Sequence, residues 1–207
     1  MSRAEAKERR KQQVLAAVEA SIRRDGRVNF SMRELADNAQ VSFATPFNLF
    51  GKKEDILAAL FNQRVTELAL KCNTRNRDED GLAHLLTIAA DSCKGYLSDA
   101  ELFKPLAQSF RTQITPQLEA VSRHAQAIWK DALDECLLEK TIEQGIDLDA
   151  LARRIHISFR VVFWMWATEE ISDQEFQEQV HNNTAACLLP HTTLKGRKAL
   201  LAALGSA

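Results

Sequence analysis

Residues 31–57 read SMRELADNAQVSFATPFNLFGKKEDIL and carry the strongest structural signal in the chain. Ser31 is followed three residues later by Glu34. This is the spacing of a capping box, in which each side chain satisfies a free backbone N–H at a helix start. Leu35 then marks the buried side of a short helix. Gly51 ends a second short helix, because glycine adopts the left-handed conformation that stops one. The stretch therefore predicts two short helices, and the charged residues after Gly51 open a third.

The segment Ala39-Gln40-Val41-Ser42 separates the two short helices. We expect it to form a turn with Val41 pointing inward and Ser42 capping the second helix. Pro46 lies in that second helix, where an interior proline costs about 3 kcal/mol. It is tolerated near the helix start, for example with Thr45 as N-cap and Pro46 at the first position. Two short helices joined by a three- or four-residue turn form a helix-turn-helix, which places its second helix in the DNA major groove.

The same stretch contains a longer pattern, made up of Leu35-Ala36, Ala39-Gln40-Val41-Ser42, Thr45, Phe47, Phe50 and Lys53-Glu54-Asp55-Ile56. At these residues the chain resembles the tetracycline-repressor (TetR) family of bacterial transcriptional regulators. Three departures from the family pattern matter, and one of them is Pro46 within the second helix. Gln40 replaces the usual turn glycine, and Phe47 replaces a tyrosine whose hydroxyl normally reaches a phosphate. The close match covers about a quarter of the chain.

The resemblance implies that the second short helix reads duplex DNA. Serine and threonine hydroxyls bond phosphates or base edges, Asn48 pairs with adenine, and Phe43 packs on a thymine methyl group. For Phe43 and Phe47 the alternative is burial in the core of the head, although the family pattern places Phe47 toward the DNA backbone. Lys53 lies at the start of a helix, where the helix dipole disfavours a cation. A contact between Lys53 and a DNA phosphate would offset this unfavourable interaction. The candidate DNA-binding residues are Ser31, Ser42, Phe43, Ala44, Thr45, Phe47, Asn48 and Lys53.

Composition and charge agree with a helical protein whose N-terminal part binds DNA. The chain has 207 residues, 45% of them hydrophobic, with only 7 Gly and 4 Pro, which favours long helices with few turns. Residues 1–56 hold 11 Lys/Arg against 8 Asp/Glu, and residues 57–207 hold 16 against 20. The positive excess of 3 therefore lies where the helix-turn-helix lies.

Neither an export signal nor a membrane segment is expected. The first residues are charged, and the longest apolar run, Val161–Ala167, is far shorter than the roughly 20 residues that span a bilayer. We expect a cytoplasmic protein with no membrane partner. The cysteines are widely spread and are interpreted as small apolar fillers, with a redox switch as the lesser alternative. They are Cys72, Cys93, Cys136 and Cys187.

Apolar residues recur at helical spacing along the whole chain, without strand-like alternation. We predict an all-α protein of nine or ten helices. Residues 1–55 form a three-helix helix-turn-helix head for DNA binding, and residues 56–207 form a larger domain for ligand binding and dimerisation. Beside the two short helices, the predicted helices cover about 4–24, 54–74, 82–97, 101–113, 116–145, 148–171 with Asp147 as its cap, 173–189 and 198–204.

The helix over 148–168 is apolar on more than one side, so both sides have to be covered. One side faces its own bundle, and the other needs a partner chain or a ligand. We favour a homodimer with Val161, Trp164 and Met165 at the interface. The alternative is a central helix of a monomeric bundle.

Aromatic residues of the second domain are candidates for an effector site. Aromatics at helical spacing are more often plain core, but members of the TetR family usually carry an effector pocket in this bundle. The resemblance therefore implies a small, mostly apolar effector, with polar anchors among Gln108, His124, His156 and Arg160. The candidate ligand-binding residues are Phe103, Phe110, Trp129, Phe159, Phe163 and Trp166.

Sequence signals for catalysis are weak. The chain lacks H-E-x-x-H, G-x-G-x-x-G, a phosphate loop and G-x-S-x-G, and we expect no enzyme, no cofactor and no metal. The favoured interpretation is a DNA-binding transcriptional regulator. It acts as a repressor that a small effector releases from a near-palindromic duplex operator. The alternative is a helical ligand- or protein-binding module without specific DNA binding, and an α-helical metalloenzyme is a remote third.

Overall fold

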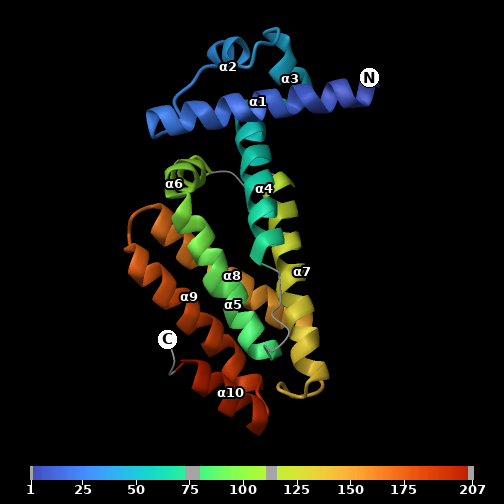
Figure 1. Ribbon diagram of the computed structural model, residues 1–207, viewed down its shortest axis with the longest axis vertical. Coiled ribbons are helices and arrows are strands. Elements are labelled where there is room, and N and C mark those ends of the chain that lie inside the picture. Colours follow the sequence, from blue (N-terminus) through green and yellow to red (C-terminus); the bar gives the residue numbers. More distant parts are fainter. Residues whose placement is uncertain (1, 73–79, 111–115, 205–207) are drawn as a thin grey trace. The chain divides into compact units, whose positions relative to one another are not determined.

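The computed structural model describes residues 2–72, 80–110 and 116–204, without the side chains of residues 72, 116–118, 120 and 121. The described chain holds ten α-helices and no strand, so the prediction of an all-α protein is confirmed (Figure 1). An isolated bridge joins Ile142 and Thr192. The helices are α1 (Arg3–Asp25), α2 (Met32–Asn38), α3 (Ala44–Phe50), α4 (Lys53–Cys72), α5 (Gly81–Ser98), α6 (Ala100–Gln108), α7 (Pro116–Leu138), α8 (Leu148–Ala167), α9 (Asp173–Leu188), the 3-10 helix η1 (Leu189–His191) and α10 (Leu194–Leu204).

Contacts divide the chain into two compact units. The first comprises Met1–Val65 and Asp99–Ala120, and the second comprises Thr66–Ser98 and Val121–Ala207. The helix α4 contributes residues to both units. None of the described helices is both long and apolar enough to cross a membrane.

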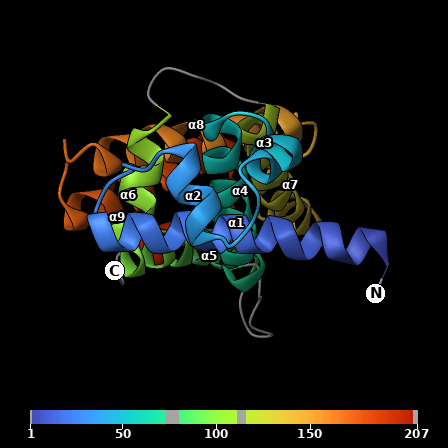
Figure 2. The ribbon, with the colours of Figure 1, turned by 90° about the horizontal axis from the view of Figure 1, so that it is seen from above.

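In the first unit, α2 and α3 both pack against α1 (Figure 2). The core forms on the C-terminal half of α1, where Val14, Val18 and Ile22 are fully buried at helical spacing. Leu35 of α2 and Ile56 of α4 are also buried. The N-terminal half of α1 has no buried residue and projects past α3.

In the second unit, α9 packs between α8 and α5, and α10 packs on α5. The bounds of two helices differ from the prediction. α7 ends at Leu138, well before Gly145, because Thr141 turns back and gives both its N–H and its hydroxyl to the carbonyl of Cys136, at 2.9 Å each. This backbone turn requires the positive φ of 57° at Lys140.

The same kind of turn ends α8 at Ala167, whereas the prediction placed its end near Ile171. Glu170 N–H donates to the carbonyl of Met165, and Glu169 adopts a φ of 63°. The last helix, α10, begins at Leu194, four residues earlier than predicted. The predicted ends of two further helices, at Thr74 and Gln113, lie outside the described residues.

Candidate nucleic-acid interface

The capping box predicted at the start of α2 is confirmed. Ser31 Oγ accepts the N–H of Glu34 at 3.2 Å, and Glu34 Oε2 accepts the N–H of Ser31 at 2.7 Å. The backbone N–H and the hydroxyl of Ser31 both bond the Glu34 carboxylate, and they hold the pKa of Glu34 below its usual value. For its predicted phosphate contact, the Ser31 hydroxyl has to turn its proton from this carboxylate to the phosphate.

The turn between α2 and α3 is a Schellman motif without glycine. Val41 N–H donates to the carbonyl of Ala36 at 3.0 Å, and Gln40 N–H donates to that of Asp37 at 3.1 Å. Gln40 takes the left-handed position with a φ of 54°, which costs an L-residue about 1–2 kcal/mol. The sharp turn aims α3 away from α2, and it makes Gln40 and Ser42 exposed.

The start of α3 differs from the prediction. The helix begins at Ala44, so Pro46 occupies its third position and Thr45 is not the N-cap. Pro46 is tolerated there because the first four N–H groups of a helix have no partner within it. Ser42 does not cap a backbone N–H with its side chain. Its hydroxyl instead bonds the Thr45 hydroxyl at 2.8 Å, while its carbonyl accepts the N–H of Thr45 at 2.8 Å.

One face of α3 points to solvent. Phe43 is 56% exposed and Phe47 is 43% exposed, so neither ring is buried in the core of the head. Ala44 and Asn48 are exposed beside them, whereas Pro46 is buried on the opposite side. The structure thus brings four predicted DNA-binding residues together on one helical surface of the first unit.

Lys53 makes contacts within the head. Its Nζ donates a hydrogen bond to the carbonyl of Phe30 at 2.7 Å and lies 4.3 Å from the centre of the Phe30 ring. Burial lowers the pKa of Lys53. The ammonium keeps two further N–H donors, so its predicted contact with a phosphate would use these.

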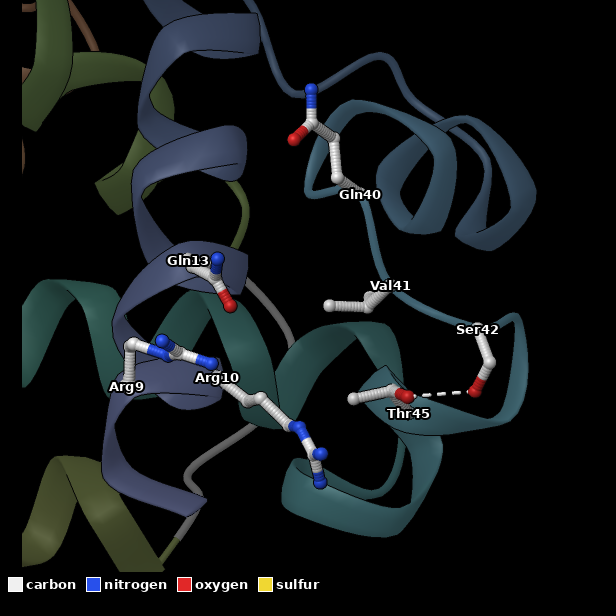
Figure 3. Close-up of a pocket in the computed structure, with 7 residues that line it drawn as sticks. All are labelled: Arg9, Arg10, Gln13, Gln40, Val41, Ser42 and Thr45. Carbon is white, nitrogen blue, oxygen red and sulfur yellow. Dashed lines mark hydrogen bonds between the residues drawn. The ribbon is translucent and has the colours of Figure 1, made fainter. Parts of the chain in front are cut away.

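The structure adds three residues of α1 to the candidate interface that the sequence did not suggest: Arg9, Arg10 and Gln13. They line an open hollow of about 420 Å³, whose opposite wall is formed by Gln40, Val41, Ser42 and Thr45 (Figure 3). Arg10 extends from α1 toward α3 (Figure 3). Residues that lie about 30 positions apart in the sequence thus form one polar surface.

The distribution of charge in the head is the sequence feature that could have indicated this part of α1. Residues 1–13 hold five Lys/Arg and two Asp/Glu, whereas residues 14–56 hold six of each. The whole positive excess of the head therefore lies on the exposed half of α1. A concentrated basic segment of this kind is the electrostatic feature that attracts a phosphate backbone.

Comparisons with known proteins bear on the fold. No family model and no curated protein matches the sequence. The structure is similar to a TetR transcriptional regulator from Rhodococcus sp. RHA1, with a TM-score of 0.71, 17% identity, and coverage of 87% of this chain and 95% of that one. A TetR-family transcriptional regulator from Pectobacterium atrosepticum gives 0.70 and 20%, with coverage of 92% and 95%. SmeT, the repressor of the Stenotrophomonas maltophilia multidrug efflux pump SmeDEF, gives 0.64 and 17%, with coverage of 89% and 91%.

The chain has the TetR fold. Within it, the six predicted ligand-binding aromatics belong to two clusters. Phe103 and Phe110 pack edge-to-face on Phe61 in the first unit, at ring-centre distances of 6.2 and 5.7 Å. In the second unit, Phe159 contacts Trp129, and Phe163 contacts Trp166.

Trp166 has the marks of a structural residue in the TetR fold. It is fully buried, stacks on Phe176 at 5.0 Å, and donates its indole N–H to Asp173 at 2.7 Å. Of the four polar anchors considered, only His156 is buried. The assignment of these aromatics to a ligand site stays a prediction.

The residues predicted to form the dimer interface lie on the outer side of α8. Val161 is 51% exposed and Ile157 is 45% exposed, while Trp164 and Met165 are half-buried. These apolar residues follow one another at helical spacing along a single stripe. Among the described residues, no group of three His, Cys, Asp or Glu side chains is placed to hold a metal ion.

Proposed function

We propose that this protein is a DNA-binding transcriptional regulator of the TetR family that acts as a repressor. The observation that carries the proposal is the pairing of an exposed α3 face with the basic half of α1. A helix with one solvent-exposed face can enter a major groove. The cations beside it can then bind the phosphates that border that groove. In this proposal, residues 1–55 bind DNA and residues 56–207 bind the effector and dimerise.

Contacts to the DNA fall into two groups. Arg9, Arg10 and Lys53 supply charge for phosphates, and the hydroxyls of Ser31, Ser42 and Thr45 supply neutral donors. Contacts of this kind fix the register of the protein on the duplex without reading its sequence. Phe43, Ala44 and Asn48 lie on the exposed face of α3 and read base edges.

The proposed assembly is a homodimer built on α8. The exposed stripe around Val161 and Ile157 is covered when two copies pair with two-fold symmetry, and an interface of this type presents the same patch on both partners. Two heads then meet two half-sites about 34–36 Å apart, or a multiple of that distance, on one side of the duplex. The operator is therefore near-palindromic.

Release from the operator is assigned to a small, mostly apolar effector held by aromatic side chains of residues 56–207. SmeT, one of the similar structures, is a repressor of a multidrug efflux pump, which supports an effector of this kind. An effector that prefers the conformation with weak DNA affinity lowers operator binding, with a coupling of typically 1–3 kcal/mol. By reciprocity, operator DNA weakens effector binding by the same factor.

Selection from a random-sequence duplex library by the full-length protein tests the proposal. We expect one near-palindromic sequence to be enriched and to shift in a gel assay. Arg10→Ala should weaken binding to every sequence and reduce the slope of log affinity against log salt by about 0.9 for each phosphate that the variant no longer neutralises. Lys198→Ala, which changes an exposed lysine of α10, is the matched control and should leave the slope unchanged. Failure to enrich any sequence would refute specific DNA binding.

A further inference from the structure

The segment that carries the recognition surface has no charged residue. Residues 38–51, NAQVSFATPFNLFG, contain no Lys, Arg, Asp or Glu. The commonest specific contact to guanine is a bidentate one from Arg or Lys to O6 and N7, and cytosine is read by a carboxylate that accepts from N4. Neither contact is available from α3. Base reading by this helix therefore depends on its neutral side chains.

Two aromatic rings dominate the exposed face of α3. The ring centres of Phe43 and Phe47 lie 5.5 Å apart, with an angle of 65° between the ring planes. Residues four apart lie on the same face of a helix, and Phe47 supports the ring of Phe43 edge-to-face. Phe43, at 56% exposure, is the outer ring of the pair. The neighbour Ala44 is exposed and small, so it leaves room for a close approach to the pair.

We propose that Phe43, positioned by Phe47, reads thymine in the operator through its C5-methyl group; this rests on the proposed function. The thymine methyl is the apolar group that bases present in the major groove, and an aromatic ring is a suitable partner for it. Asn48 lies on the same exposed face, where its amide pairs with N6 and N7 of adenine. Each half-site therefore has a thymine facing Phe43 and an A·T pair facing Asn48.

The surroundings of the ring pair favour duplex DNA over an apolar protein surface as its partner. Ser42 and Thr45, on either side of Phe43 in the sequence, line the hollow that also contains Arg9 and Arg10 (Figure 3). An apolar partner would leave these two guanidinium groups facing it without compensation. A duplex supplies methyl groups inside the groove and phosphates at its edge, and so matches both parts of the surface.

Removing single methyl groups from the DNA tests the assignment. The duplex selected by the full-length protein is synthesised with deoxyuridine in place of thymidine at one position at a time. Wild type should bind about fourfold more weakly for each methyl group removed from beneath the ring, which corresponds to about 0.8 kcal/mol per apolar carbon. Phe43→Ala should bind the thymidine duplex more weakly and show no response to deoxyuridine. Phe43→Leu keeps an apolar side chain and should retain the response.

Variants of Phe47 and Asn48 distinguish the residue that contacts the methyl group from the residue that positions it. Phe47→Ala should reduce the deoxyuridine response. Phe47→Tyr, which keeps an aromatic ring, should show the wild-type response. Asn48→Ala should weaken binding but keep the full response, because it leaves the ring pair intact. Circular dichroism and thermal melting check that the variants of these exposed residues are folded.

The outcomes distinguish this inference from the proposed function. If the selected duplex binds equally well with deoxyuridine at every thymidine position, methyl reading is wrong and DNA binding stands. If Phe43→Ala keeps the wild-type response, another residue reads the methyl and the inference is overturned. If no duplex is enriched or bound, both the inference and the proposed function are overturned.

Discussion

The guanidinium of Arg23 donates two parallel hydrogen bonds to the carboxylate of Asp99, of 2.6 and 2.8 Å. Asp99 is the residue before α6, so the pair joins the C-terminal end of α1 to the start of α6 within the first unit. Arg23 also donates to Glu19, whose other carboxylate oxygen accepts from Arg64 of α4. The hydrogen bonds to Asp99 and Glu19 raise the pKa of Arg23 above its usual value. Three helices are thereby linked by one chain of charges.

A double-mutant cycle of Arg23→Ala and Asp99→Ala measures the strength of this link. Both side chains are partly exposed, so we expect a coupling free energy of only about 0.5–1 kcal/mol, decreasing at high salt. Urea unfolding of the four proteins gives the value. The neighbouring pair Arg24 and Asp25, with Arg24 63% exposed, is the matched control and should show almost no coupling. Strict additivity for Arg23 and Asp99 would show that the link adds no stability.

The left-handed turn at Gln40 predicts a stabilising substitution. Gln40→Gly removes the cost of a positive φ for an L-residue and adds some chain entropy to the unfolded state, so a net gain of about 0.5–1 kcal/mol is expected. Lys140→Gly, at a φ of 57°, should gain a similar amount in the second unit. Arg33→Gly, inside α2, should instead lose about 1 kcal/mol. A loss of stability in Gln40→Gly, measured by urea unfolding, would contradict this account of the turn.

His156 predicts how stability depends on pH. It is 7% exposed, its Nε2 has no hydrogen-bond partner among the described residues, and burial, with a smaller contribution from Arg160, lowers its pKa to about 4. The folded state therefore binds its proton more weakly than the unfolded state, whose histidine pKa is about 6.5. Stability is unaffected above pH 6.5 and falls as the pH drops from 6.5 toward 4.

The loss attributable to His156 should reach about 2 kcal/mol at pH 5. Other groups also titrate in this range, so the measurement is the difference between wild type and His156→Gln in urea unfolding at pH 7 and pH 5. The variant should lose less stability on acidification than wild type does. Equal losses in the two proteins would mean that His156 binds its proton as readily in the folded state as in the unfolded state.

The exposed stripe on α8 predicts the oligomeric state. Val161→Glu places a charge in the middle of the proposed interface, where burial without a partner is costly. We expect a dimer for wild type and a monomer for the variant in sedimentation experiments at micromolar concentration. Leu138→Glu, at an 83% exposed position outside the stripe, is the matched control and should remain dimeric. A monomeric wild type would contradict the proposed dimer.

Helix starts that carry a capping side chain were predicted better than helix ends. Ser31 with Glu34, and Asp147 before α8, signal a start through side chains that cap local N–H groups, and the structure contains both caps. The ends of α7 and α8 use Lys140 and Glu169 in the left-handed position, where glycine is the usual signal. Neither residue type marks a stop, so the predicted helices ran on to later breaks in the pattern.

Part of the proposed DNA-binding surface could be predicted from the sequence. Phe43, Phe47 and Asn48 could be assigned because local spacing places them on one helical face. Arg9 and Arg10 were missed because the hollow they line depends on how α1 packs against the turn at Gln40, which helical periodicity does not specify. The contact of Lys53 with Phe30 is likewise a product of tertiary packing.

The ratio of two affinities tests whether this protein binds DNA in a sequence-specific way. The full-length protein is titrated into the selected duplex and into a shuffled duplex of the same length and composition, at one physiological salt concentration, and binding is followed by fluorescence anisotropy. A specific regulator should bind the selected duplex about a thousandfold or more tightly than the shuffled one. Equal affinity for the two duplexes would contradict the account and leave a helical protein that meets DNA only through its charge.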